Sequence, residues 1–159
     1  GDNYDVNAFM SIAKPLGWEI HVAGKQRKLS KMVYAAATQI HSLEAAKNIS
    51  IDDYTAIVLM SHDYKIDLTL LKEYIQKNVP YIGLLGPKKR MQKMQDELIS
   101  HGIDINLSNC ANLFSPVGLD IGAESPEEIA LSIASEIIAV FRERGGSFLK
   151  KRQGSIHSE

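Results

Sequence analysis

The stretch 55–90 constrains the fold most, because it contains two short apolar runs separated by one helical pattern. The runs 56–60 and 81–85 show no polar alternation, which is typical of strands buried on both faces of a sheet. Between them, apolar residues such as Leu68 and Leu71 recur at helical spacing. Two buried strands joined by one helix predict a right-handed βαβ unit with parallel strands.

Polar and cationic groups directly follow both runs. Ser61-His62-Asp63 comes after the first run, and Gly86-Pro87-Lys88-Lys89-Arg90 comes after the second. Ligands of parallel sheets bind at the carboxyl ends of the strands, so we expect function there. The glycine turn, the three cations and the start of the next helix would together form an anion site. A purely structural role for the histidine stays open.

The N-terminal part predicts a helix over 4–16, which begins after Gly1-Asp2-Asn3, and a strand over 18–22. Asp2 or Asn3 can cap the helix. In a dinucleotide-binding domain, the first strand and its glycine loop are followed by a helix and then a strand, which is the order found here after Gly1. A glycine present by chance would give the same order. We therefore expect an α/β fold, a Rossmann-like three-layer sandwich with a mainly parallel sheet that lacks its first strand. On this interpretation the chain is an excised domain or has lost its start.

The end of the predicted strand over 18–22 differs from the corresponding position of a typical NAD site. Such a site carries an acidic residue there to hold the ribose hydroxyls, whereas this chain has Ala23-Gly24 followed by Lys25, Arg27 and Lys28. The cations favour either a ligand phosphate or a solvated basic loop. Farther along, residues 35–40 are interpreted as a short edge strand, and Asp67 as an alternative cap of a helix over 68–78.

The C-terminal third predicts a helix over 90–100, a short strand near 113, a loop containing Gly118 and Asp120, and a final helix that ends near 142. Ser125, Pro126 and Glu128 form the start signal of that helix, with a capping box. We expect a Rossmann-like domain over 1–146 and a flexible basic tail over 147–159.

Composition excludes several classes. A chain of 159 residues with net charge −1 predicts one domain with no general attraction to nucleic acid or anionic membrane. No apolar run approaches the roughly 20 residues of a spanning helix, and we expect a cytoplasmic protein. The single cysteine, Cys110, is interpreted as structural; it excludes a disulfide framework or cysteine-based zinc site within one chain, and no metal site is expected.

Three motifs in fixed order resemble the C-terminal Rossmann-type domain of the XdhC/CoxI family, accessory proteins of xanthine dehydrogenase-type molybdenum hydroxylases. They are VLMSHDYKIDLTLL, YIGLLGPKKR and SPVGLDIGAESPEEIALSIASEIIAV, and LGWEIHVAGKQRK also matches in position. The resemblance covers about residues 4–142. Departures are the missing first strand with its glycine loop, the missing N-terminal domain, and Pro87 where the family commonly has serine.

The resemblance implies a protein that binds molybdenum cofactor, as molybdopterin or its dinucleotide form, as cargo rather than for catalysis. It implies sulfuration of the cofactor with a cysteine desulfurase and delivery to a molybdenum hydroxylase apo-enzyme. The alternatives are an NAD(P)-dependent oxidoreductase and a pure interaction domain. An open slot left by the missing strand also allows another segment or a homodimer. The candidate cofactor-binding residues are Gly1, Asp2, Asn3, Ser61, His62, Asp63, Gly86, Lys88, Arg90, Gly118 and Asp120.

Overall fold

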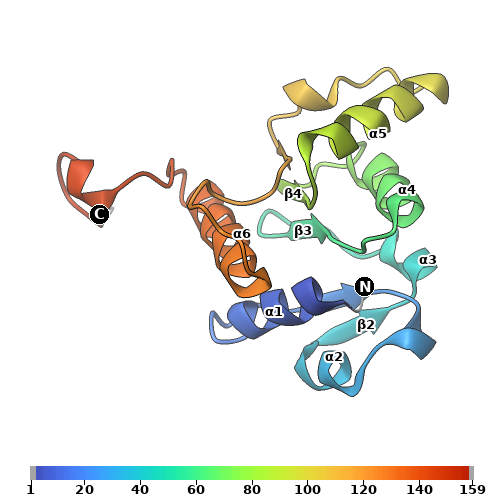
Figure 1. Cartoon of the computed structure of the whole chain (residues 1–159), viewed down its shortest axis with the longest axis horizontal. Coiled ribbons are helices and arrows are strands. Elements are labelled where there is room, and N and C mark those ends of the chain that lie inside the picture. Colours follow the sequence, from blue (N-terminus) through green and yellow to red (C-terminus); the bar gives the residue numbers. More distant parts are fainter. Residues whose placement is uncertain (1–2, 158–159) are drawn as a thin grey trace.

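The computed structural model describes residues 3–157, and Gly1 and Asp2 lie outside the described part (Figure 1). The strands are β1 (His21–Ala23), β2 (Gln39–His41), β3 (Ala56–Leu59), β4 (Tyr81–Leu84) and β5 (Leu113–Phe114). The helices are α1 (Tyr4–Ala13), α2 (Lys31–Ala36), α3 (Leu43–Ala46), α4 (Tyr64–Tyr74), α5 (Lys88–Ser100) and α6 (Pro126–Phe141). Short 3-10 turns occupy Gln26–Lys28, Leu107–Asn109 and Leu149–Lys151.

All strand pairs of the described residues are parallel, and they form two half-sheets. One half-sheet contains β1 and β2, and the other has the order β3-β4-β5. The βαβ unit predicted from the two apolar runs is β3-α4-β4, with Ala56 opposite Tyr81 and Leu59 opposite Leu84. The α/β fold class with a parallel sheet is confirmed.

Helices cover both faces of the strands, which gives three layers. Helices α3, α4 and α5 pack on one face around a core that includes Leu59 and Leu84. Helices α1, α2 and α6 pack on the other face around a core that includes Val22, Met60 and Tyr81. Both faces of the strands are therefore apolar, which explains the runs without polar alternation.

Local capping explains where two of the helices begin. The start of α6 is as predicted: Ser125 Oγ accepts from the Glu128 N–H, and the Glu128 carboxylate accepts from the Ser125 N–H. Helix α4 begins at Tyr64 rather than at position 68, because Asp63 accepts from the N–H groups of Lys65 and Ile66. The interpretation of Asp67 as a helix cap is therefore wrong.

The short N-terminal elements were predicted less well. The first strand covers His21–Ala23 instead of 18–22. The predicted edge strand over 35–40 is split between the end of α2, which Ser30 caps through the Val33 N–H, and β2. Helix α5 begins two residues earlier than expected, at Lys88.

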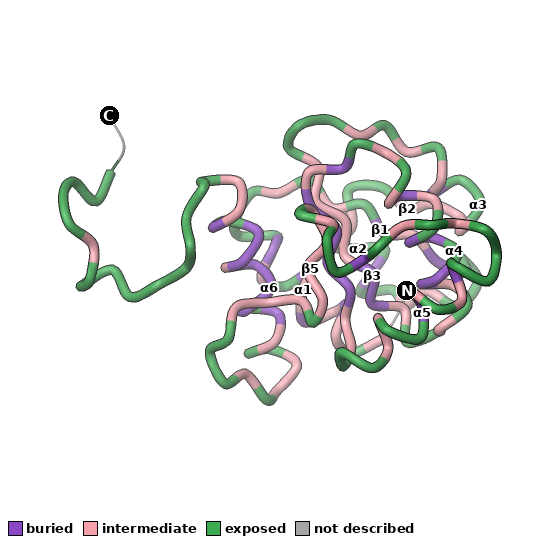
Figure 2. The backbone as a smooth tube through the Cα atoms, turned by 90° about the horizontal axis from the view of Figure 1, so that it is seen from above, coloured by how far each residue is buried: buried purple, intermediate pink, exposed green. Residues whose placement is uncertain are grey.

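The segment after α6 leaves the body of the domain, and nearly all of its described residues are exposed (Figures 1 and 2). Its flexibility and the boundary at residue 146 stay predictions. None of the described helices combines the length and the apolar character that crossing a bilayer requires.

Candidate functional site

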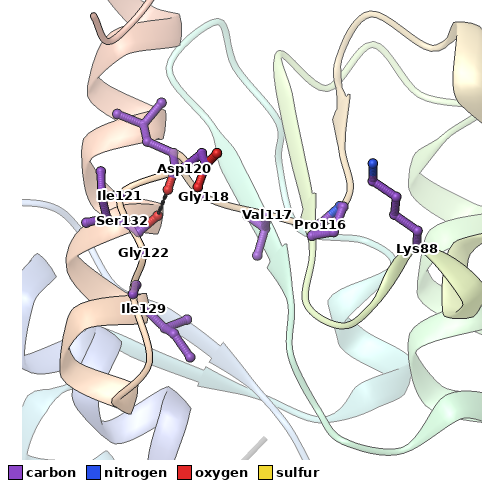
Figure 3. A pocket seen from close by; sticks show the side chains of 11 residues that line it. Lys88, Pro116, Val117, Gly118, Asp120, Ile121, Gly122, Ile129 and Ser132 are labelled. Atoms are coloured by element: carbon purple, nitrogen blue, oxygen red, sulfur yellow. Dashed lines mark hydrogen bonds between the residues drawn. The ribbon is translucent and has the colours of Figure 1, made fainter. Parts of the chain in front are cut away.

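Two cavities adjoin at the carboxyl ends of β3, β4 and β5, where Ile129 of α6 lines both. The His62 cavity, of about 350 Å³, is lined by Asp5, Met60, His62, Asp67, Leu85, Gly86, Pro87, Arg90 and Ile129. The Gly118 cavity, of about 450 Å³, is lined by Lys88, Ile129, Ser132 and residues 116–123 (Figure 3). Each volume lies in the range of small-molecule sites.

The loop after β3 is held by hydrogen bonds to the start of α4. Ser61 donates to Asp67 Oδ1 from its hydroxyl at 2.6 Å and from its backbone N–H at 3.2 Å. Asp63 is the N-cap of α4, so its carboxylate has a structural task. Neither Ser61 nor Asp63 lines either cavity. Of the predicted trio, only His62 does so.

His62 has a left-handed backbone with φ of 61°, which turns the chain at the end of β3. Its Nε2 lies 2.5 Å from Oδ2 of Asp5, at the start of α1. The histidine side chain is 56% exposed, whereas that of Asp5 is 16% exposed. The pair therefore joins α1 to the loop after β3 and leaves much of the imidazole accessible to a ligand. Sequence reasoning missed Asp5, which lies 57 residues away.

Arg90 is paired inside the protein. Its Nη2 lies 2.7 Å from Oδ2 of Asp67, whose side chain is only 2% exposed. The guanidinium also lies over the ring of Tyr64, with its central carbon 5.5 Å from the ring centre. Burial, and then the hydrogen bond to Glu97, raise the pKa of Tyr64 to about 12, so this phenol stays neutral at physiological pH.

The three cations after β4 do not converge as the sequence suggested. Arg90 lines the His62 cavity, Lys88 lines the Gly118 cavity, and Lys89 lines neither. The helical spacing of α5 separates their side chains, and the ion pair with Asp67 fixes the side chain of Arg90. The turn itself is as expected: Gly86 has φ of 129°, and no side chain caps α5 at Pro87. The Arg90 N–H donates to the Pro87 carbonyl at 2.8 Å, which leaves the N–H groups of Lys88 and Lys89 at the start of α5 for an anion.

The loop after β5 is pressed against α6. Gly118 has φ of 106°, and a Cβ atom there would lie 2.4 Å from Oγ of Ser132. Ser132 donates from this oxygen to the carbonyl of Leu119 at 2.6 Å, as Figure 3 shows. The close approach of the loop to α6 requires glycine, and Gly118, Asp120 and Ser132 all line the same cavity.

Glu136 holds the same loop from within the core. Its Oε1 accepts from the Gly118 N–H at 2.9 Å and from the Tyr81 hydroxyl at 2.7 Å. Burial, and then this hydrogen bond, raise the pKa of Tyr81. Sequence reasoning missed Glu136, although a carboxylate between Ile133 and Ile137 on an apolar helix face was a usable signal.

The remaining predicted residues lie at the edge of the site or outside it. Gly1 and Asp2 are outside the described residues. Asn3 caps α1 through the Val6 N–H and donates from Nδ2 to the carbonyl of Met60 at 2.8 Å. The cations at 25–28 line neither cavity. Partial burial raises the pKa of Cys110, which is consistent with a structural thiol.

Comparison with known proteins gives two curated relatives. A protein from Bacillus subtilis (strain 168), described as a probable subunit of xanthine dehydrogenase, is 38% identical over 85 residues, or 54% of this chain and 23% of that protein. A protein from Escherichia coli (strain K12), described as uncharacterized protein YqeB, is 28% identical over 151 residues, or 91% of this chain and 27% of its own length. The chain thus spans about a quarter of the length of these relatives.

A solved structure and a family profile agree with these two relatives. The crystal structure of a xanthine dehydrogenase from Bacillus halodurans superposes with a TM-score of 0.74 at 27% identity, over 88% of this chain and 40% of that one. The family profile of the XdhC Rossmann domain matches residues 1–137. The chain therefore belongs to the XdhC family, of which it represents the Rossmann domain.

Proposed function

We propose that this protein binds the molybdenum cofactor as cargo and delivers it to the apo-enzyme of a xanthine dehydrogenase-type molybdenum hydroxylase. Membership of the XdhC family supports this proposal, and so does the description of one relative as a probable component of xanthine dehydrogenase. The structural observation that carries it is the pair of adjoining cavities at the carboxyl ends of β3, β4 and β5. Parallel sheets bind their ligands at this edge.

The residues of the two cavities fit the phosphate and the pterin of such a cofactor. Lys88 and the uncapped N–H groups of α5 suit its phosphate, in molybdopterin or in the dinucleotide form. His62 and the carboxylate of Asp120 offer hydrogen-bonding groups for the polar edge of a pterin. Gly118 lets the loop pack closely against Ser132 of α6, and both residues line the Gly118 cavity. In the hydroxylase, the delivered molybdenum centre supplies the redox chemistry.

Sulfuration is assigned to a partner rather than to this chain. Cys110 lines neither cavity, and its raised pKa keeps the thiol protonated. We therefore propose that a cysteine desulfurase supplies the sulfur while the protein holds the cofactor.

An oxidoreductase that uses NAD(P) is the alternative on the same fold, since fold alone does not determine function. Strand β1 ends at Ala23, followed by Gly24, so neither residue offers a carboxylate to the ribose hydroxyls. No described feature favours this alternative over the cofactor carrier.

Anaerobic titration calorimetry with isolated molybdenum cofactor, and in parallel with NADH and NADPH, tests the proposal. We expect binding of the molybdenum cofactor alone. The variant His62→Ala should weaken this binding about tenfold, or about 1.4 kcal/mol. It should lower the free energy of unfolding by less than about 1 kcal/mol, because the mostly exposed side chain loses a single contact, the one with Asp5. His101→Ala is the matched control, since His101 follows α5 away from both cavities.

Binding of NADPH without molybdenum cofactor would instead support the oxidoreductase. Binding of neither, with retained binding to a hydroxylase, would support a pure interaction domain. Equal affinities of His62→Ala and His101→Ala would remove His62 from the site.

A further inference from the structure

Most of the surface of α6 is covered by the rest of the domain. Ile133 and Ile137 belong to the core that also contains Met10 of α1 and Tyr81 of β4. On a neighbouring side, Ser132 holds the Gly118 loop. The remaining side faces solvent, at the margin of the domain from which the tail departs (Figures 1 and 2).

The solvent side of α6 carries one line of residues, the α6 stripe, which consists of Glu127, Leu131, Ser135, Ile138 and Arg142. At about 100° per helical residue, all five lie within an arc of about 80°. Leu131 is 50% exposed and Ile138 is 42% exposed, and both charged residues are exposed as well. The helical path extends to Arg142, whose N–H donates to the Ile138 carbonyl at 3.0 Å. The stripe therefore runs along the whole length of the helix.

The stripe has the same spacing when it is followed from either end. Its acidic, two apolar and basic residues are separated by intervals of four, seven and four residues. Exposed apolar residues alone are ordinary on a protein surface. In two antiparallel copies of this stripe, however, Glu127 lies opposite Arg142 while Leu131 lies opposite Ile138. The small residue Ser135 lies next to the midpoint, where two packed helices approach most closely.

Charge selects the antiparallel orientation. A parallel pair would place the Glu127 residues of two copies side by side, and likewise the Arg142 residues, and like charges in contact are unfavourable. Neither residue takes part in an ion pair among residues 3–157. Glu127 accepts from the Tyr4 hydroxyl at 2.7 Å, and this neutral donor leaves the carboxylate charge unbalanced. Both charges are therefore available to a second copy.

We propose that the α6 stripe is the contact surface of a two-fold homodimer, in which the α6 helices of two copies pack antiparallel. The contact is isologous and closes on itself, as in most homodimers. Each dimer contains two ion pairs between Glu127 and Arg142, on either side of an apolar centre formed by Leu131 and Ile138. One pair of helices is a small interface, so we expect a dissociation constant on the order of 10 to 100 µM.

The tail is complementary to the same partner. Phe148 is 70% exposed, so its own chain does not cover it. Because Arg142 of one copy lies opposite Glu127 of the other, the residues after Arg142 run past the start of the other α6. That start carries further negative charge at Glu124, whereas residues 150–152 of the tail are all cationic. Opposite charges thus meet along the continuation of the stripe.

The dimer contact does not use the side of α6 that lines the cavities. Ile129, which lines both of them, lies about 160° around the helix from the middle of the stripe. The inference therefore goes beyond the proposed function and does not rest on it.

Sedimentation velocity over a range of protein concentrations tests the dimer. The sedimentation coefficient of the chain should rise with concentration from the value of a monomer to that of a dimer. Leu131→Glu should weaken association at least about tenfold, because it buries an unpaired charge in the apolar centre. Ile99→Glu is the matched control: Ile99 is 53% exposed on α5, outside the stripe, so its replacement should leave association unchanged.

Charge reversal tests the antiparallel orientation. In a homodimer, Glu127→Lys places a lysine beside Arg142, and Arg142→Glu places a glutamate beside Glu127. Each variant alone should therefore associate about tenfold more weakly. An equimolar mixture of the two should dimerise as the unchanged chain does, because both contacts of the mixed pair again join opposite charges. Recovery in the mixture also shows that both variants are folded.

Three results would overturn the proposal. A chain that stays monomeric up to about 1 mM would show that the stripe does not bind a second copy. Association that persists unchanged in Leu131→Glu would place the dimer contact elsewhere on the molecule. Weakening by both charge reversals without recovery in the mixture would exclude antiparallel pairing. None of these measurements involves a cofactor, so their failure is distinguishable from failure of the proposed function.

Discussion

The loops after β3 and β5 end at the same edge of the sheet, but different interactions hold them. The His62 loop, residues 61–63, depends on ionisable groups: the Asp67 carboxylate accepts from Ser61 and pairs with Arg90, and His62 contacts Asp5. The Gly118 loop, residues 115–122, depends on close backbone contact with Ser132 and on hydrogen bonds to α6. One loop is fixed by charge and the other by shape.

Because of this difference, the two loops offer different groups to a ligand. In the His62 loop, the charge of Arg90 is already balanced by Asp67, so the imidazole is the accessible polar group. In the Gly118 loop, glycine lets the backbone pack against Ser132, and Lys88 lines the same cavity as a cation with no ion pair among the described residues. We therefore expect the second cavity to carry most of the affinity for phosphate.

The largest effect is expected from Arg90→Met, which removes the partner of a carboxylate that is almost fully buried. Breaking such a pair costs about 4 kcal/mol of unfolding free energy. Urea denaturation measures this loss. Lys89→Met is the matched control, because Lys89 is exposed on the same helix turn and should change stability by less than about 0.5 kcal/mol.

The double variant Asp67→Asn with Arg90→Met sharpens this test. It removes both charges, while the amide oxygen can still accept from Ser61, so much of the lost stability should return. Equal stabilities of Arg90→Met and Lys89→Met would mean that charge does not hold the His62 loop.

A smaller loss is expected from Gly118→Ala in the other loop. The added methyl group combines a strained backbone, with φ of 106°, and a contact of 2.4 Å with Ser132 Oγ, for a total of about 3 kcal/mol. Gly122→Ala is the control: its φ is 72°, but its Cβ would meet nothing within 4 Å, so strain alone should cost about 1 kcal/mol. Denaturation midpoints compare the two, and similar losses would contradict fixation by shape.

The features predicted correctly from sequence are those that local patterns determine. The parallel unit over 55–90 follows from two apolar runs and one helical pattern, and the cap of α6 follows from three signals within four residues. The two parallel half-sheets with helices on both faces agree with the predicted Rossmann-like α/β fold. The short elements between positions 29 and 54 carry no long periodic pattern, so their boundaries depend on contacts with the rest of the fold.

The site residues that sequence reasoning missed have partners far along the chain. Asp63 and Asp67 both look like helix caps, and only the contact with Arg90, 23 residues away, gives Asp67 its other role. Glu136 lies 55 residues from Tyr81, so its purpose cannot be inferred from its own helix. Local pattern identified the edge of the sheet where the site lies, but tertiary pairing decided which side chains remain free for a ligand.

Glu136 provides the most sensitive test of the difference between the two loops, because its carboxylate holds the Gly118 loop, which otherwise depends on close packing. Replacement by leucine leaves the Gly118 N–H and the Tyr81 hydroxyl without their acceptor, at a cost of about 2 kcal/mol. Glu136→Gln should cost less than about 1 kcal/mol, since both donors bond to one oxygen that the amide retains. Urea denaturation of both variants separates the two contributions. If glutamine were as costly as leucine, the charge of Glu136 rather than its acceptor geometry would hold the Gly118 loop, and both loops would then depend on charge.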